Sequence, residues 1–156
     1  MIACIIGHSG AGKSTIFNCI KKYYDRYYEA DRLVQCAYDD DFNVKYYIQT
    51  NFSVVDEKGT VNKVTLLEKL LADKDAKEKF EDFLFETVLI PIINEAEAEG
   101  NSLLIDGILP YEKYLNYFDQ VITVKVNEET RRNNLLSRGV SAKRIDQIFK
   151  LQEGLF

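Results

Sequence analysis

The sequence contains few of the residues that build zinc sites and disulfide frameworks. Its three cysteines are an odd number without C-x-x-C spacing, and His8 is its only histidine. Structural zinc sites need about four Cys or His ligands, and disulfide frameworks need cysteines in pairs. We therefore expect neither, and we interpret Cys4, Cys19 and Cys36 as small hydrophobic residues that are buried or half-buried.

Positive charge and long apolar runs are also scarce. The 156 residues carry 20 Lys and Arg against 25 Asp and Glu, which gives a net charge of −5. This balance argues against a protein that binds long nucleic acid through a basic surface. The first apolar run is too short for a signal peptide or a membrane span. We expect a cytoplasmic protein with no membrane partner, and the sequence leaves open whether it is a monomer or a homo-oligomer.

A phosphate-binding motif directly follows that first run. Residues 7–15, Gly-His-Ser-Gly-Ala-Gly-Lys-Ser-Thr, fit G-x-x-x-x-G-K-[ST] at every fixed position, between a strand-length apolar run and a helical pattern. We prefer this interpretation to a chance glycine-rich turn, because glycines let backbone N–H groups point inward at an anion. Lys13 is expected to reach the β- and γ-phosphates and Ser14 to hold Mg²⁺. The expected nucleotide-binding residues are Gly7, Ser9, Gly10, Ala11, Gly12, Lys13, Ser14 and Thr15.

Two acidic residues come at the ends of predicted strands. Asp106 ends the apolar segment 101–105, where a carboxylate orients Mg²⁺ or its waters, although an Asp before Gly107 also suits a simple turn. Asp31 stands where a second strand gives way to a helix, and spacing alone favours a helix N-cap over a catalytic carboxylate. Residues 39–41, three aspartates, predict a solvated turn rather than a metal site.

The carboxyl-terminal part carries a cluster of basic residues. Arg131 and Arg138 are seven residues apart, so we expect both on one face of a helix from 128 to 137. The cluster is either a solvated helix face or a lid that clamps phosphate. It consists of Arg131, Arg132, Arg138, Lys143 and Arg144.

The remaining pattern alternates strands and helices. We expect a first helix from Ser14 to Tyr24 or Arg26, with the pair at 27–28 either continuing it or starting a strand. Segment 44–55 fits helix or strand. We expect a helix over 74–99 that Pro91 kinks or divides and that ends before Gly100. The apolar run 121–126 predicts a strand that is buried on both faces.

Residues 56–63 match parts of two guanine-nucleotide motifs, D-x-x-G and N-K. The match fails on spacing, because each motif must follow its own buried strand and two intervening residues cannot form one. We therefore predict a glycine-containing turn followed by a helix cap.

These elements predict an α/β chain with the three-layer P-loop NTPase fold. We expect a parallel sheet of about four to five strands with helices on both faces and a helical acceptor-binding insertion. The chain is expected to form one domain, residues 1–156. Its core would comprise 1–38 and 101–156, its acceptor-binding region about 40–100 and its lid about 128–145.

Along nearly its whole length the sequence resembles the dephospho-CoA kinase family, a branch of the nucleoside-monophosphate-kinase-like P-loop proteins. Residues 29–31, Glu-Ala-Asp, look like the family's Asp-Ala-Asp, and the spacing from the loop lysine to Asp31 is preserved. Residues 59–66 and 106–112 look like two further family motifs. Arg138 and Gln152 look like the lid arginine and the glutamine that ends the following helix.

The resemblance implies transfer of the ATP γ-phosphate to the ribose 3′-hydroxyl of dephospho-CoA. It implies that Asp31 accepts the hydroxyl proton, a role that replaces the N-cap interpretation, and that Arg138 stabilises charge on the transferring group beside Lys13. ATP and Mg²⁺ are the implied cofactors, and we place Arg131 with the nucleotide-binding residues.

The sequence departs from the family at positions that concern the acceptor and the adenine. The first acid of the triad is Glu29, residues 85–86 are Phe-Glu instead of His-Pro, and the family continues past Gln152 into a further strand and helix. A kinase is therefore better supported than a particular acceptor. The alternatives are a nucleoside or deoxynucleoside monophosphate kinase, or a nucleotide-binding protein without catalysis.

Overall fold

The computed structural model describes residues 1–155, and Phe156 lies outside the described part. The chain forms two compact units. The first unit joins residues 1–30 to the chain from residue 95 onward and contains the sheet and the phosphate loop. The second unit comprises residues 31–94 and is helical. Along the chain, the boundaries between the units fall after Ala30 and before Glu95. The division into core, acceptor-binding region and lid stays a prediction.

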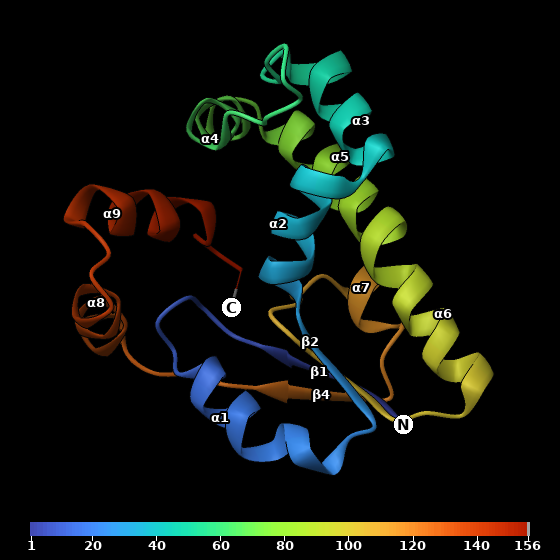
Figure 1. Ribbon diagram of the computed structural model, residues 1–156. Coiled ribbons are helices and arrows are strands. Elements are labelled where there is room, and N and C mark those ends of the chain that lie inside the picture. Colours follow the sequence, from blue (N-terminus) through green and yellow to red (C-terminus); the bar gives the residue numbers. More distant parts are fainter. Residues whose placement is uncertain (156) are drawn as a thin grey trace. The chain divides into compact units, whose positions relative to one another are not determined.

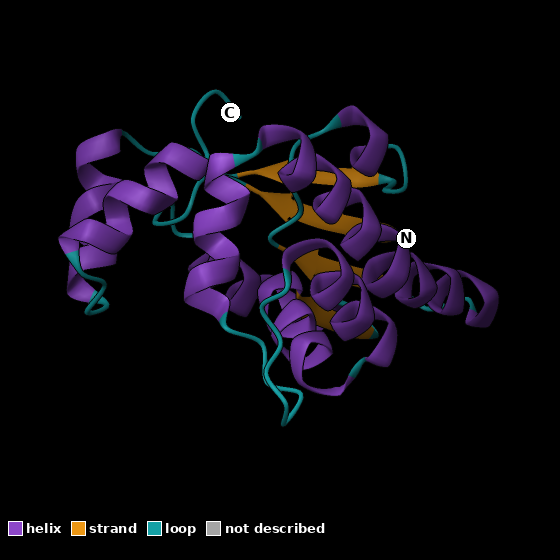
Figure 2. Cartoon of the chain, turned by 90° about the horizontal axis from the view of Figure 1, so that it is seen from above, coloured by secondary structure: helices purple, strands orange, loops and turns teal. Residues whose placement is uncertain are grey.

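Within residues 1–155 the sheet has four parallel strands, in the order β2-β3-β1-β4. Figure 1 labels β1, β2 and β4, and Figure 2 shows the strands side by side. The two central strands are completely buried, as their continuous apolar sequence predicts. The parallel α/β sheet of the P-loop fold is thereby confirmed. The strands are β1 (Ile2–Ile6), β2 (Arg26–Glu29), β3 (Leu103–Asp106) and β4 (Gln120–Thr123).

Strand β4 corrects one prediction. The apolar run 121–126 was expected to be buried on both faces, but β4 is shorter and largely exposed. The reason is its position, because β4 pairs with β1 at the edge of the sheet. Hydrophobicity alone does not decide which strand becomes central, and Val121 remains 37% exposed.

Helices cover both faces of the sheet in the first unit. Helix α1 (Lys13–Ile20) packs Phe17 against Ala3, Ile5 and Leu104 on one face. The short helix α7 (Glu112–Leu115) lies on the other face (Figure 1). These layers confirm the three-layer prediction.

Helix α1 is shorter than the sequence predicted. It gives way to a 3₁₀ turn, η1 (Lys21–Tyr23), and β2 follows. The alternative left open for the tyrosine pair at 27–28 is settled, because both residues belong to β2. The Tyr27 ring packs edge-on against Phe17, with ring centroids 6.0 Å apart.

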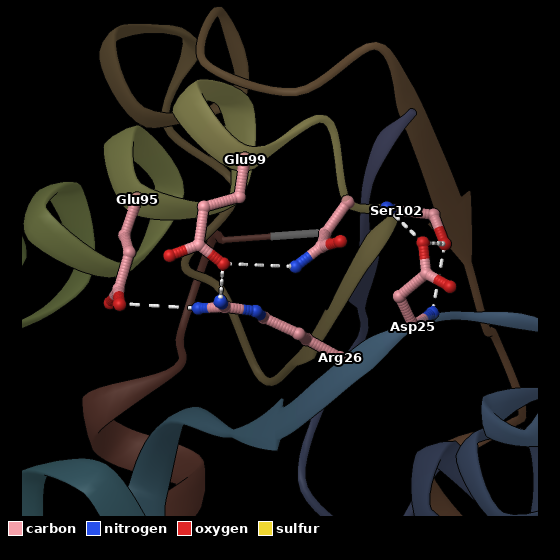
Figure 3. Close-up of polar contacts among 6 residues, drawn as sticks. Asp25, Arg26, Glu95, Glu99 and Ser102 are labelled. Atoms are coloured by element: carbon pink, nitrogen blue, oxygen red, sulfur yellow. Dashed lines mark hydrogen bonds and ion pairs between the residues drawn. The ribbon is translucent and has the colours of Figure 1, made fainter.

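A group of polar contacts joins the amino-terminal ends of β2 and β3 (Figure 3). The Asp25 carboxylate accepts hydrogen bonds from the Ser102 backbone N–H (2.8 Å) and hydroxyl (3.1 Å), and the Asp25 N–H donates to Ser102 Oγ (2.8 Å). Arg26 forms ion pairs with Glu99 and with Glu95, the latter at 3.6 Å. We call these five residues the amino-end clamp, and it ties edge strand β2 to the segment that leads into β3.

The second unit has a core of aromatic and aliphatic side chains. Phe80 is 2% exposed and lies among the rings of Tyr38, Tyr47 and Phe52. Segment 44–55, which fitted either helix or strand, is mainly helical. The helices are α2 (Ala30–Asp40), α3 (Phe42–Phe52), α4 (Lys63–Ala72) and α5 (Lys74–Leu84), of which the first residue of α2 belongs to the first unit.

The helix predicted over 74–99 continues through Pro91, so the expected division into two separate helices does not occur. Helix α5 is followed by a π-helical segment, η2 (Phe85–Leu89), and then by α6 (Ile90–Glu99). Proline has no N–H to donate and its ring crowds the preceding turn, so the local widening accommodates it without ending the helix. Gly100, with φ of 67°, follows the last residue of α6 and acts as the predicted stop.

The turn at residues 56–60 and the cap that follows it are confirmed. The Asp56 carboxylate accepts hydrogen bonds from the N–H groups of Lys58 and Thr60, both at 2.9 Å, and Gly59 has φ of 80°. Asn62 then caps α4 by accepting from the Thr65 N–H. Ordinary turn chemistry therefore accounts for the residues that match guanine-nucleotide motifs.

The cysteines correct another prediction. Cys4 is fully buried, and burial raises the pKa of its thiol to about 12, but Cys19 and Cys36 are exposed. Both lie on helices, α1 and α2, whose buried faces are formed by other residues. No helix within the described chain is long and apolar enough to cross a membrane.

Candidate nucleotide-binding site

The phosphate loop joins β1 to α1, and its three glycines are required for different reasons. A Cβ at Gly7 would lie 2.5 Å from the Val124 carbonyl oxygen, and one at Gly10 would lie 2.6 Å from the Arg131 carbonyl oxygen. Gly12 has open space around it, but its φ of 94° at the N-cap of α1 disfavours other residues. Packing fixes the first two positions and backbone conformation fixes the third.

Lys13 lies folded over the loop. Its ammonium group donates hydrogen bonds to the carbonyl oxygens of Gly7 (2.8 Å) and His8 (3.1 Å). Ser14 follows it in the first turn of α1, which contains no acidic residue. The first turn of a helix presents N–H groups and partial positive charge, so the loop and the start of α1 can bind an anion together.

The register of the sheet places two carboxylates on the face covered by α1. Asp106 ends β3 and pairs with Ile5 on one side and with Glu29 on the other. Paired residues of parallel strands point to the same face, and Ile5 packs against Phe17 of α1. Asp106 is only 7% exposed. The strand-end position predicted for Asp106 is observed, and Glu29 shares it.

Asp31 is the second residue of α2, two residues after the end of β2. Its side chain is exposed and belongs to the second unit. Helix α2 already begins at Ala30, so Asp31 lies inside the first turn instead of serving as the N-cap suggested by spacing. Burial, followed by the charge of Asp31, raises the pKa of Tyr38 to about 12.

The two helices after β4 are confirmed, but their arginines differ in environment. Arg131 on α8 (Glu128–Ser137) is buried, whereas Arg138 is exposed at the C-cap. Arg138 directly follows the last residue of α8, and the expectation that it shares a helix face with Arg131 stays a prediction. Asn127 caps α8, and Ser141 caps α9 (Ala142–Leu151).

Arg131 ties α8 to the phosphate loop. Its Nε donates to the Ser9 carbonyl oxygen (3.2 Å), and its guanidinium group stacks over the Phe149 ring at 4.1 Å. Burial lowers the pKa of Arg131, and the charge of Glu128 acts in the opposite direction. The contact with the loop agrees with the placement of Arg131 among the nucleotide-binding residues, which remains a prediction.

Sequence reasoning did not anticipate two further contacts with the loop. Asn134 donates to the Gly10 carbonyl oxygen at 2.7 Å. Its position three residues after Arg131 is the signal that it shares that helix face. Gln152, the C-cap of α9, accepts a hydrogen bond from the Ser9 N–H at 2.9 Å, and no local pattern predicts a contact across 143 residues.

His8 lies within this arrangement as well. Partial burial lowers the pKa of its imidazole, the charges of Arg131, Lys13 and Lys125 act in the same direction, and a hydrogen bond with the Gln152 backbone opposes them. Burial is the largest cause, and the three nearby cations add positive charge that attracts a phosphate.

No three His, Cys, Asp or Glu side chains in residues 1–155 are grouped as ligands of a metal ion. The solvated turn predicted at residues 39–41 is corrected, because Asp39 and Asp40 are the last two residues of α2 and Asp41 caps α3 by accepting from two backbone N–H groups.

Comparisons with known proteins agree with this geometry. The chain is 28% identical over 158 residues to a dephospho-CoA kinase from Wolbachia sp. subsp. Brugia malayi (strain TRS), covering 97% of this chain and 80% of the relative. It is 25% identical over 157 residues, with the same coverage, to a dephospho-CoA kinase from Wolbachia pipientis wMel.

A solved structure and a family model extend the comparison. The crystal structure of TT1252 from Thermus thermophilus matches 99% of this chain and 81% of that chain, with a TM-score of 0.76 and 20% identity, which supports the fold. The model described as AAA domain matches residues 4–153. Together with the phosphate loop and the parallel sheet, this match shows that the chain belongs to the AAA domain family of P-loop proteins.

Proposed function

We propose that the chain is an ATP- and Mg²⁺-dependent kinase that phosphorylates a small nucleotide-like acceptor, first the 3′-hydroxyl of dephospho-CoA. The observation that carries the proposal is the glycine cradle at residues 7–12, with Lys13 folded over it and Asp106 at the end of the neighbouring strand. The acceptor comes from the curated relatives, both of which are named dephospho-CoA kinase.

The loop and its neighbours supply binding and charge. Backbone N–H groups at the start of α1 and the Lys13 ammonium group would hold the β- and γ-phosphates of ATP. Arg131, already in contact with the loop, would bind nucleotide from α8, and Arg138 would stabilise charge on the transferring group. Phosphoryl transfer depends mainly on such positioning and electrostatic stabilisation.

The oxygen ligands fit Mg²⁺. This ion uses one or two protein oxygens together with substrate phosphates and waters, and a hydroxyl and a carboxylate are ligands of the right type. Ser14, in the first turn of α1, and Asp106, on the sheet face that α1 covers, would hold it, Asp106 through water. When bound, the ion neutralises phosphate charge.

Asp31 is proposed as the general base. Its carboxylate would accept the proton of the acceptor hydroxyl as that oxygen forms a bond to the γ-phosphorus and the bond from phosphorus to ADP breaks. Asp31 lies exposed in the first turn of α2, and a carboxylate is a common general base.

Replacing Asp31 by Asn tests both the base and the acceptor. We expect acceptor-dependent ADP formation to fall by about 10²- to 10⁴-fold while ATP binding is retained, because the amide keeps the shape but cannot take the proton. The matched control is Asp39→Asn, an exposed aspartate on the same helix. Steady-state turnover should be measured with dephospho-CoA and with a panel of nucleoside and deoxynucleoside monophosphates.

Each alternative gives a different result. Turnover with a monophosphate but not with dephospho-CoA identifies a nucleoside or deoxynucleoside monophosphate kinase. ATP binding without acceptor-dependent ADP formation identifies a nucleotide-binding protein without catalysis. Equal losses in the Asp31→Asn and Asp39→Asn variants would remove Asp31 from the reaction.

A further inference from the structure

Gln152 holds a position at the phosphate loop that an anionic oxygen would suit. Its Oε1 accepts hydrogen bonds from the Ser9 backbone N–H (2.9 Å) and from Arg131 Nη2 (3.4 Å). Its Nε2 donates to Ser9 Oγ at 3.0 Å. A backbone N–H of a phosphate loop and a guanidinium N–H are the donors that phosphate oxygens take in proteins.

Two other side chains, those of Arg131 and Asn134, donate hydrogen bonds to carbonyl oxygens of the loop and do not accept from its N–H groups. Arg131 Nε donates to the Ser9 carbonyl oxygen, and Asn134 Nδ2 donates to the Gly10 carbonyl oxygen. Those two contacts occupy carbonyl oxygens of the loop and not its N–H groups. Gln152, in contrast, places an acceptor on one of those N–H groups.

Helix α9 does not need this contact to end properly. The Gln152 backbone N–H already donates to the carbonyl oxygens of Ile148 and Lys150, which completes the last turn of the helix. The side chain is therefore not committed to capping its own helix, and its amide is turned toward a loop 143 residues away in sequence.

We propose that Gln152 is a specificity-determining residue that competes with the terminal phosphate of ATP for the Ser9 N–H and for Arg131. Binding of ATP exchanges the neutral amide oxygen for a charged phosphate oxygen and releases the end of α9 from the loop. The terminal phosphate is the group concerned, because Lys13, the residue expected to reach the β- and γ-phosphates, donates to the carbonyl oxygens of Gly7 and His8, directly before Ser9 in the loop. This inference rests on the nucleotide binding of the proposed function.

Two substitutions with opposite expected effects test the competition. Gln152→Ala removes the competing oxygen, and we expect a non-hydrolysable ATP analogue to bind about two- to tenfold more tightly, the range set by one ordinary hydrogen bond. Gln152→Glu puts a carboxylate on the same donors and should weaken that binding about tenfold or more. For both variants the change should be smaller with ADP. Titration calorimetry measures all of these affinities, and Gln147→Ala, on the same helix, is the matched control with unchanged affinity.

The outcomes separate this inference from the proposed function. If the wild type binds the ATP analogue and the Gln152→Ala variant binds it equally or more weakly, the proposed competition is wrong. Nucleotide binding by the loop would remain supported. Equal shifts for the ATP analogue and ADP overturn the assignment to the terminal phosphate. Failure of both wild type and Gln152→Ala to bind any nucleotide overturns both. Thermal unfolding of each variant establishes that it is folded, and Gln152→Glu, which keeps the length and shape of the side chain, provides the test if the alanine variant does not fold.

Discussion

The two ends of the parallel sheet are built from opposite kinds of contact. At the amino end, the clamp joins Arg26 to two glutamates and Asp25 to Ser102, so charges meet partners of opposite sign or strong donors within the chain. At the carboxyl end, Arg131 contacts the neutral carbonyl oxygen of Ser9 and the neutral amide oxygen of Gln152. A guanidinium group that binds neutral oxygens can exchange them for a phosphate at little cost, whereas an ion pair must first be broken.

The difference teaches which end is available to a ligand. The clamp fixes edge strand β2, and with it the register that places Glu29 beside Asp106. The phosphate loop instead presents backbone N–H groups in a conformation that depends on three glycines. Substitutions at the amino end should therefore change stability, and substitutions at the carboxyl end should change binding.

The largest effect is expected from Gly10→Ala. The new Cβ would lie 2.6 Å from the Arg131 carbonyl oxygen at a φ of 82°, so the loop must move to accept it. Overpacking and the left-handed backbone together cost about 2 kcal/mol or more, which predicts a loss of nucleotide affinity of about 30-fold or more. Titration with ATP measures it.

Gly100→Ala is the matched control at the other end of the sheet. Gly100 also has a left-handed φ, 67°, but open space surrounds its Cβ position. The variant should lose about 1 kcal/mol of stability and keep its nucleotide affinity. An equal loss of affinity in the two variants would contradict the assignment of the carboxyl end as the binding end.

A smaller effect is expected from Ser102→Ala in the clamp. The substitution removes the hydroxyl that bonds to both the N–H and the carboxylate of Asp25, and should cost about 1 kcal/mol in unfolding free energy without changing ATP affinity. Chemical denaturation measures the stability. A change in affinity with unchanged stability would show that the two ends are not separate in function.

The stability that the clamp contributes should also depend on pH. Hydrogen bonds from Ser102 lower the pKa of Asp25 below its ordinary 3.8. The stability that the ionised form contributes is therefore present above that value and is lost as the pH falls through the folded-state pKa. In Ser102→Ala the Asp25 pKa should rise toward its ordinary value, which NMR titration of the carboxyl carbon follows.

The smallest effect is the titration of His8. Burial and nearby cations lower its pKa below 6.5, so the neutral imidazole is the form that the folded loop prefers. Its contribution to stability is present above pH 6.5 and is lost as the pH falls through the lowered pKa. ATP binding should raise the pKa, because phosphate charge favours the imidazolium ion.

His8 is the only histidine, so a single imidazole signal reports this pKa by NMR. A pKa at or above 6.5 without nucleotide, or one that ATP lowers, would contradict the positive potential inferred at the loop.

The parts of the fold that the sequence predicted are those that local rules control. The loop glycines, the helix cap that follows the turn at residues 56–60 and the helix stop at Gly100 follow from conformation and hydrogen bonding within a few residues. The apolar segment that precedes it likewise located Asp106 at the end of a strand. Neighbouring residues are sufficient to determine each of these features.

The parts that were missed depend on which elements meet. The exposure of β4 follows from its place at the sheet edge, and Arg131 is buried while Arg138 is not because α8 packs on the loop and ends at Ser137. The contact between Gln152 and Ser9 joins residues 143 apart. Periodicity within one helix or strand carries no information about such partners.

The uneven exposure of the cysteines provides a ready means of following the two units. Cys4 is enclosed and resists thiol reagents, whereas the thiol of Cys19 lies on α1 of the first unit and that of Cys36 on α2 of the second. A donor and an acceptor dye attached to the natural chain would thus occupy one unit each, and energy transfer between them would register any movement that ATP brings about.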